Sequence, residues 1–248
     1  MENLVIYHEN DIEINNKIKY YKKLGINAVL INPFVIVDEE IIKEVLTINN
    51  NLKKEDIRLM VRVDVVKISA LLLDLASQVK WDNPKIRKAF YQFINYLKKY
   101  NLRGFYFTNF EKLFAANPSF YIRELSKNTL GDENLVSIGE VDTDDFAYQK
   151  YLASDEYSNF SYIYNRSLET PMENLLSAKK YISAIHSENV REVYSTDNVL
   201  ASFTNNKNFP FLTRTLLAGV NLFLRGGFLL KNFEELGIFD NSTYPNDY

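Results

Sequence analysis

Short apolar runs rich in β-branched and aromatic residues alternate along the chain with longer amphipathic segments. The short runs predict strands, and the longer segments, with apolar residues at helical spacing, predict the helices between them. In chain order the predicted strands cover residues 4–7, 28–31, 59–66, 104–107, 135–138, 162–164, 199–203 and 228–230. The predicted helices cover residues 12–24, 38–46, 83–99, 175–185 and 212–224.

Start and stop residues support several of these boundaries. Gly25 follows the first predicted helix as a stop signal, and Asp38 is a capping residue before the second. Asn83-Pro84 opens the clearest helix of the sequence, which has apolar residues on one face and lysines on the other. The Asn-Asn-Asn run at 49–51 predicts a solvated loop.

Strands that alternate with helices favour a parallel sheet covered by helices. Eight such strands in a chain of 248 residues fit one closed (β/α)8 TIM barrel over residues 1–248 better than an open sheet. An open, doubly wound sheet is the structural alternative. However, the chain has only eight glycines, and none has the spacing of a dinucleotide-binding loop. We therefore expect an α/β protein with a single barrel domain.

Composition removes several classes of function. The formal net charge of −3 gives no reason to expect nucleic acid or a membrane surface as a partner. Without cysteine the chain has no disulfide, thiolate metal site or cysteine nucleophile, and two histidines do not make a histidine-rich metal site. No cofactor or metal is expected. The N-terminal residues lack the pattern of a secretory signal and no run is apolar enough to span a membrane, so we expect a cytoplasmic protein.

Six short motifs then occur in one order along the chain. They are Leu24-Gly25 before a strand that ends in Asn32-Pro33, Arg62–Val66, Trp81–Arg87, Gly104-Phe105, Gly139-Glu140, and 228–230 followed by Glu234–Gly237. In this order and spacing they resemble the catalytic barrel of glycoside hydrolase family 13, the α-amylase family. The resemblance is strongest to its oligo-1,6-glucosidase and trehalose-6-phosphate hydrolase branch. An unrelated barrel that shares short apolar strings is the alternative.

The resemblance implies a minimal member of that family. Between the third strand and the helix start at Trp81 the family inserts a small domain that walls the substrate cleft, and here only about a dozen residues intervene. The chain also stops soon after the eighth predicted strand, without the C-terminal β-sandwich that normally follows. We therefore expect a barrel that lacks both additions.

The family's catalytic positions carry other side chains here. A retaining glycosidase needs two carboxyl groups about 5 Å apart, one as nucleophile and one as general acid. Matching the Gly-Phe-Arg-x-Asp pattern places Tyr106 at the arginine and Thr108 at the nucleophile. Glu140 matches the general acid and keeps its carboxylate. A threonine hydroxyl without a neighbouring base is a poor nucleophile, so the resemblance implies a catalytically degenerate site.

Other expected sugar contacts are also altered. Asp64 lacks the Asn-His that should follow it, and its structural interpretation is a carboxylate hydrogen-bonded at the end of a strand. Behind the predicted seventh strand Asn205-Asn206 stand where the family has His-Asp, so the third-acid position, Asn206, is degenerate. The candidate substrate-binding residues are Asp64, Tyr106, Asn205 and Phe34.

Three functional hypotheses follow. The first is a non-catalytic α-amylase-like barrel, a pseudoenzyme that acts by binding a carbohydrate or a protein partner. The second is a residual or altered α-glucosidase that uses Glu140 as general acid with Asp142, Asp144 or Glu111. The third is a fold that persists without a selected role. Truncation near strands one and eight further predicts exposed apolar surface, covered by a homo-oligomer or a partner chain.

Aromatic residues are also concentrated near the predicted strand ends. They can stack on a sugar ring, but filling the core in place of a polar site is the favoured interpretation. The residues concerned are Tyr7, Phe34, Tyr106, Phe107, Phe110, Phe203, Phe209 and Phe211.

Overall fold

The computed structural model describes nine stretches of the chain. They are residues 4–9, 13–32, 39–72, 80–109, 118–131, 134–141, 160–165, 192–195 and 226–231.

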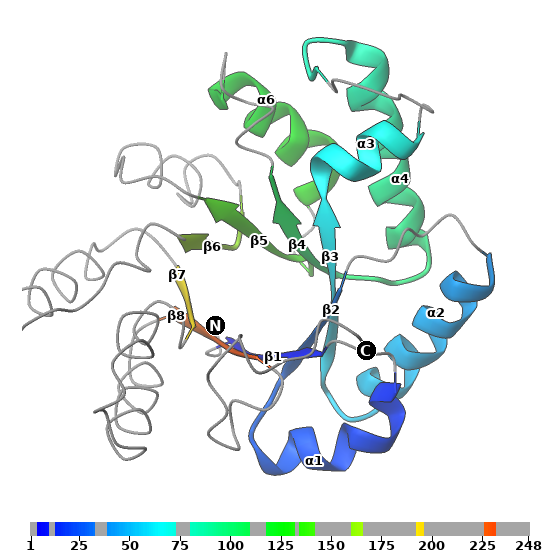
Figure 1. The fold of residues 1–248 in the computed structure, drawn as a ribbon, viewed down its shortest axis with the longest axis vertical. Helices are drawn as coiled ribbons and strands as arrows, with labels where there is room; N and C mark the ends of the chain where they lie inside the picture. The colour runs from blue at the N-terminus through cyan, green and yellow to red at the C-terminus, as the bar shows by residue number, and fades with distance from the viewer. Residues whose placement is uncertain are drawn as a thin grey trace, which may run out of the picture.

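Eight parallel strands close into a barrel in the order in which they occur in the sequence (Figure 1). The first and last strands pair directly, from Leu4 with Gly227 to His8 with Lys231. This pairing confirms the predicted closed barrel and excludes the open sheet. The strands are β1 (Leu4–Glu9), β2 (Ala28–Ile31), β3 (Arg58–Asp64), β4 (Gly104–Thr108), β5 (Val136–Val141), β6 (Tyr162–Asn165), β7 (Glu192–Ser195) and β8 (Gly226–Lys231).

The described helices lie outside the strands (Figure 1). They are the 3₁₀ helix η1 (Glu13–Lys17), α1 (Ile18–Lys23), α2 (Glu39–Lys53), α3 (Val65–Leu72), α4 (Pro84–Lys99), α6 (Pro118–Leu125) and the π-helical turn η2 (Ser126–Leu130). Helix α4 begins as the sequence predicts. Asn83 is its N-cap, accepts a hydrogen bond from the Lys85 amide at 3.0 Å, and is followed by proline at the first helical position.

Two apolar clusters hold the barrel together, because successive strand residues point alternately inward and outward. The inward cluster fills the barrel and is formed by Leu4, Ile6, Ala28, Leu30, Met60, Tyr106, Ile138, Tyr162, Tyr164 and Leu229. The outward cluster joins strands to helices, for example where Phe107 meets Phe90 of α4 and Tyr7 meets Tyr21 of α1. Tyr7, Tyr106 and Phe107 are thus all buried in the core, but only Tyr106 lies inside the barrel, where its hydroxyl still contacts Glu140.

Helix α2 extends to Lys53 and includes the predicted loop at 49–51, so that loop prediction was wrong. The apolar spacing continues through the run, because Ile48 and Leu52 are both buried. Asn49 is buried between them, and its amide donates to the Asn101 carbonyl at 3.4 Å. Tertiary burial therefore outweighs the weak helix propensity of asparagine.

Two strand predictions also need correction. Strand β3 ends at Asp64, and Val65 and Val66 begin helix α3 rather than extending the strand to residue 66. The strand in seventh place is Glu192–Ser195, so the seventh strand was predicted at the wrong position. The segment 199–203, and the helices predicted at 175–185 and 212–224, lie outside the described residues.

The apolar surface expected near strands one and eight is not found in the described parts of those strands. Leu4, Ile6, Phe228 and Leu229 are all buried. The exposed large apolar side chains among the described residues lie on helices or directly behind them, and are Tyr20, Leu24, Leu71, Tyr96, Tyr100 and Phe120. Among the described residues, exposed apolar surface that a partner could cover therefore lies on the helical layer and not at strands one and eight.

Candidate functional site

The candidate site lies where the strands end at their carboxyl termini, which is the functional face of barrels of this kind. Strands β3, β4 and β5 each direct a polar side chain inward near this end: Arg62, Tyr106 and Glu140. Arg62 and Tyr106 are register partners in adjacent strands, and β5 pairs with the other side of β4. The three side chains therefore meet above the apolar filling of the barrel.

Glu140 is the centre of this cluster. The Tyr106 hydroxyl donates a hydrogen bond to its Oε2 at 2.9 Å, and an Arg62 guanidinium nitrogen lies 3.9 Å from the same oxygen. The guanidinium also lies 6.0 Å from the centre of the Tyr106 ring. Glu140 is 9% exposed and Tyr106 4%. Glu140, which the motif order matches to the general acid, is thus engaged by neighbouring side chains.

The Tyr106 hydroxyl is fixed as a donor. Burial first, and then the adjacent Glu140 carboxylate, hold the pKa of Tyr106 well above its ordinary value. Tyr106 consequently stays protonated throughout the physiological range and cannot act as a base there.

Asp64 performs the structural role expected of it. Its Oδ1 accepts from the amides of Val66 and Lys67, at 3.1 and 3.0 Å, which caps the start of α3. Its Oδ2 accepts from the side-chain amide of Asn109 at 2.9 Å. Asp64 is therefore bound to its own helix and to the residue that follows β4.

Thr108 stands opposite Asp64 in the pairing of β3 with β4 and is 2% exposed. Like Tyr106 two residues earlier, it belongs to the inward-facing positions of β4. Thr108, which the motif matches to the nucleophile, is therefore a buried hydroxyl on the inner side of the barrel wall.

We compared the chain with known proteins. No family model and no curated protein matches the sequence. Among solved structures, trehalose-6-phosphate hydrolase of Bacillus licheniformis superposes with a TM-score of 0.77 at 13% identity, over 98% of this chain and 68% of that one. An inactive double mutant of MutB superposes with a TM-score of 0.77 at 15% identity, over 99% and 67%. A MutB mutant in complex with its substrate sucrose gives 0.75 at 16%, over 98% and 66%.

The chain has the barrel fold of these enzymes. It spans about two thirds of their length. One of the matched structures is a trehalose-6-phosphate hydrolase, the branch to which the motifs point. The predicted resemblance is confirmed at the level of the fold.

Within this barrel fold the sequence reasoning missed two contributors to the site. Arg62 lies two residues before Asp64, so strand alternation places both on the inward face and was the signal that could have found it. His8 of β1 lies opposite Asn32 at the end of β2, and its Nε2 is 2.8 Å from the Asn32 Oδ1. Only the barrel register brings these two together.

The remaining predicted site residues cannot be placed. Phe34, Asn205 and Asn206 lie outside the described residues, as do the alternative acids Glu111, Asp142 and Asp144. The assignment of Asn206 depended on a seventh strand at 199–203, whereas β7 ends at Ser195. In the sequence the first acid beyond that strand is Asp197.

The described ranges contain no cluster of three or more histidine, aspartate or glutamate side chains able to hold a metal ion. Nor do they contain a helix long and apolar enough to cross a membrane.

Proposed function

We propose that this chain is a non-catalytic barrel of the α-amylase type, a pseudoenzyme that binds a carbohydrate at the carboxyl ends of its strands. The observation that carries the proposal is the cluster around Glu140. One oxygen of this carboxylate is engaged by both Tyr106 and Arg62, and the side chain at the nucleophile position is the hydroxyl of Thr108. A cytoplasmic location is part of the proposal.

Loss of catalysis follows from what the transition state requires. A glycosyl transition state resembles an oxocarbenium ion and is stabilised by a carboxylate on the opposite face of the sugar from the general acid. Thr108 supplies no negative charge to such a centre, and among the described residues no base is hydrogen-bonded to its hydroxyl to make it a nucleophile. We therefore expect no turnover of α-glucosides.

Binding is supported by the polar groups that remain. The Arg62 side chain is 35% exposed, and within the described ranges its guanidinium contacts Glu140 at 3.9 Å without forming a hydrogen bond. A guanidinium offers several donors in a fixed plane, which suits the vicinal hydroxyl groups of a sugar. His8 and Asn32 add polar groups from the opposite side of the barrel end.

Calorimetric titration with maltose, isomaltose, sucrose and trehalose 6-phosphate tests the binding. We expect heat with one of these sugars and at least tenfold weaker binding for Arg62→Gln. Arg123→Gln, on the outer helix α6, is the matched control and should bind like the parent. Absence of heat at millimolar concentrations of all four sugars would remove the carbohydrate proposal.

The second candidate, a residual α-glucosidase, is favoured by one observation. Because β7 ends at Ser195, the first acid after the seventh strand in the sequence is Asp197, and a glucosidase needs a second carboxylate besides Glu140. Assays with p-nitrophenyl α-glucoside and trehalose 6-phosphate should give no turnover if the main proposal holds. Turnover that disappears in both Glu140→Gln and Asp197→Asn would establish the glucosidase instead.

A further inference from the structure

Helix α4 is strongly basic on a chain that is acidic overall. The chain has a net charge of −3, yet the sixteen residues of α4 include no aspartate or glutamate. Its basic residues are Lys85, Arg87, Lys88, Lys98 and Lys99.

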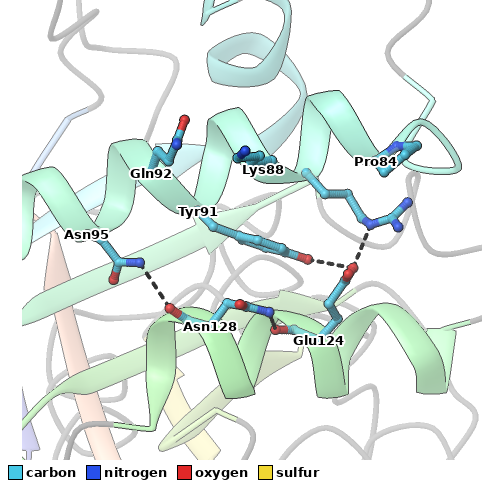
Figure 2. Close-up of a pocket in the computed structure, with 8 residues that line it drawn as sticks. Pro84, Lys88, Tyr91, Gln92, Asn95, Glu124 and Asn128 are labelled. Carbon is cyan, nitrogen blue, oxygen red and sulfur yellow. Dashed lines mark hydrogen bonds and ion pairs between the residues drawn. The ribbon is translucent and has the colours of Figure 1, made fainter.

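Two of these five cations are engaged within the molecule. Arg87 Nε lies 2.5 Å from Oε2 of Glu124 on α6, and Lys98 donates to the Thr129 carbonyl at 2.8 Å (Figure 2 shows the Glu124 pair). The other three are exposed, and within the described ranges none of their ammonium groups forms an ion pair or a hydrogen bond: Lys85, Lys88 and Lys99. No described acidic side chain therefore pairs with this positive charge on the outer side of the helix.

An apolar groove of about 570 Å³ lies beside this charge, where α3 packs on α4. Leu72, Ala89, Phe93 and Tyr96 form most of its lining, and Lys99 stands at its rim. Tyr96 is 39% exposed and packs edge to face against Tyr100, whose ring centre is 5.0 Å away. The groove therefore offers an apolar wall that water contacts directly.

A second hollow, of about 300 Å³, lies on the other side of α4, against α6. It shares Gln92 and Asn95 with the apolar groove, so these two side chains lie between the two hollows. Its walls are polar: Glu124 accepts from Tyr91 at 3.0 Å, and Asn95 donates to the Asn128 carbonyl at 3.0 Å (Figure 2). Lys88 also lines this hollow, and no interaction joins it to this network in the same view.

We propose that the outer face of α4 binds an acidic segment of another protein that inserts one aliphatic or aromatic side chain into the groove. The groove suits a buried anchor residue of the kind that dominates the affinity of protein interfaces. The three exposed lysines complement carboxylates placed around that anchor. A sugar would lack the apolar anchor, and a phosphate polymer would use the lysines and leave the groove empty. This surface lies on the outer helical layer and is separate from the barrel end.

Selection from a random peptide library displayed on phage, with the full chain as bait, tests the proposal. We expect the enriched peptides to be rich in aspartate and glutamate around one leucine, phenylalanine or tryptophan. Fluorescence anisotropy of an enriched peptide should then show binding that weakens as salt is raised. Tyr96→Asp and the double variant Lys88→Glu/Lys99→Glu should each reduce its affinity by about tenfold or more.

Matched controls separate this surface from a general effect. Tyr20→Asp alters a tyrosine of similar exposure, 37%, on α1, and Lys43→Glu reverses an exposed charge on α2. Both should bind like the parent. Tyr96→Asp removes part of the aromatic wall, whereas the lysine variant reverses charge and leaves the wall intact. Circular dichroism of both variants checks that the barrel is still folded, and one folded variant is enough for the test.

Four results would overturn the proposal. Enriched peptides without an acidic bias would contradict the charge argument, and undiminished binding by both α4 variants would place the site elsewhere. A dimer that Tyr96→Asp dissociates, seen by light scattering, would assign the face to a second copy of this chain. Anionic vesicles or a single-stranded oligonucleotide that bind through the lysines, with no enriched peptide, would assign it to a polyanion.

Discussion

Tyr106 is a buried side chain that is hydrogen-bonded to a buried carboxylate, Glu140. Its hydroxyl donates to Glu140, and without it the carboxylate would stay buried with a weaker set of partners. We expect Tyr106→Phe to lower the free energy of unfolding by about 1–3 kcal/mol at neutral pH. Urea denaturation measures the change, and Tyr20→Phe, at an exposed position, is the control.

The raised pKa of Tyr106 also gives the pH dependence a definite sign. A phenol whose pKa is higher in the folded state stabilises the fold fully below the unfolded value, about 10. This stabilisation is lost as the pH rises above that value. The alkaline decrease in stability should therefore be shallower in Tyr106→Phe than in the parent. Parallel alkaline curves for the two proteins would show that Tyr106 is not the group responsible.

Asp64 allows a test that separates capping from charge. Two backbone amides of α3 lose their acceptor in Asp64→Ala, which we expect to cost about 0.5–2 kcal/mol. Asp64→Asn keeps a side-chain oxygen at the cap and should cost much less. Thermal unfolding of the two variants makes the comparison. An equal loss in both would mean that the negative charge matters and the cap does not.

At the scale of elements, glycine at position 104 allows the first residue of β4 to pack closely against the backbone of β3. A Cβ at this position would lie 2.5 Å from the Leu59 carbonyl oxygen and 2.7 Å from Cγ of Met60. Backbone cannot move aside as a flexible side chain can, so Gly104→Ala should destabilise the barrel by about 1–3 kcal/mol. Gly131→Ala is the control, because a Cβ there would lie 3.6 Å from the Ser126 carbonyl oxygen, which is ordinary contact. Chemical denaturation of both variants measures the difference.

The same elements show what the sequence could predict. Local signals in the sequence were sufficient for α4, because its Asn-Pro start and its apolar stripe can both be read from one continuous segment. They failed at the end of β3, because Val65 and Val66 are residues that favour strands. The Asp64 side chain caps a helix at this point, so both valines are helical. Local signals also failed at the Asn run of α2, where burial against the barrel decides the conformation.

The site was predictable to a similar degree and for similar reasons. Motif order along the chain located Glu140, Tyr106 and Thr108 on adjacent strands. The contact of Arg62 with Glu140 crosses two strand pairings, and the contact of His8 with Asn32 joins residues 24 positions apart. Such contacts depend on the register of the closed sheet, and no local pattern in the sequence encodes that register.

At the scale of the whole molecule, closure of the barrel makes each strand depend on the others. Strand β8 pairs with β1 over five residue pairs and with β7 over four. A chain truncated before Gly226 would expose the edges of both neighbours, together with the inner side of the barrel. It would also lose Phe228 and Leu229, which are buried.

We therefore expect the truncated chain to lose cooperative folding and not merely stability. Near-ultraviolet circular dichroism should lose its aromatic signal, and heating should give no single transition. A separately expressed fragment that carries residues 226–248 should restore both signals if strand pairing is the cause, because it returns the same hydrogen-bonding edge. A truncated chain that melts cooperatively near the temperature of the parent would show that β1 through β7 are stable as an open sheet. In that case closure would serve to position the groups at the barrel end and would contribute little to stability.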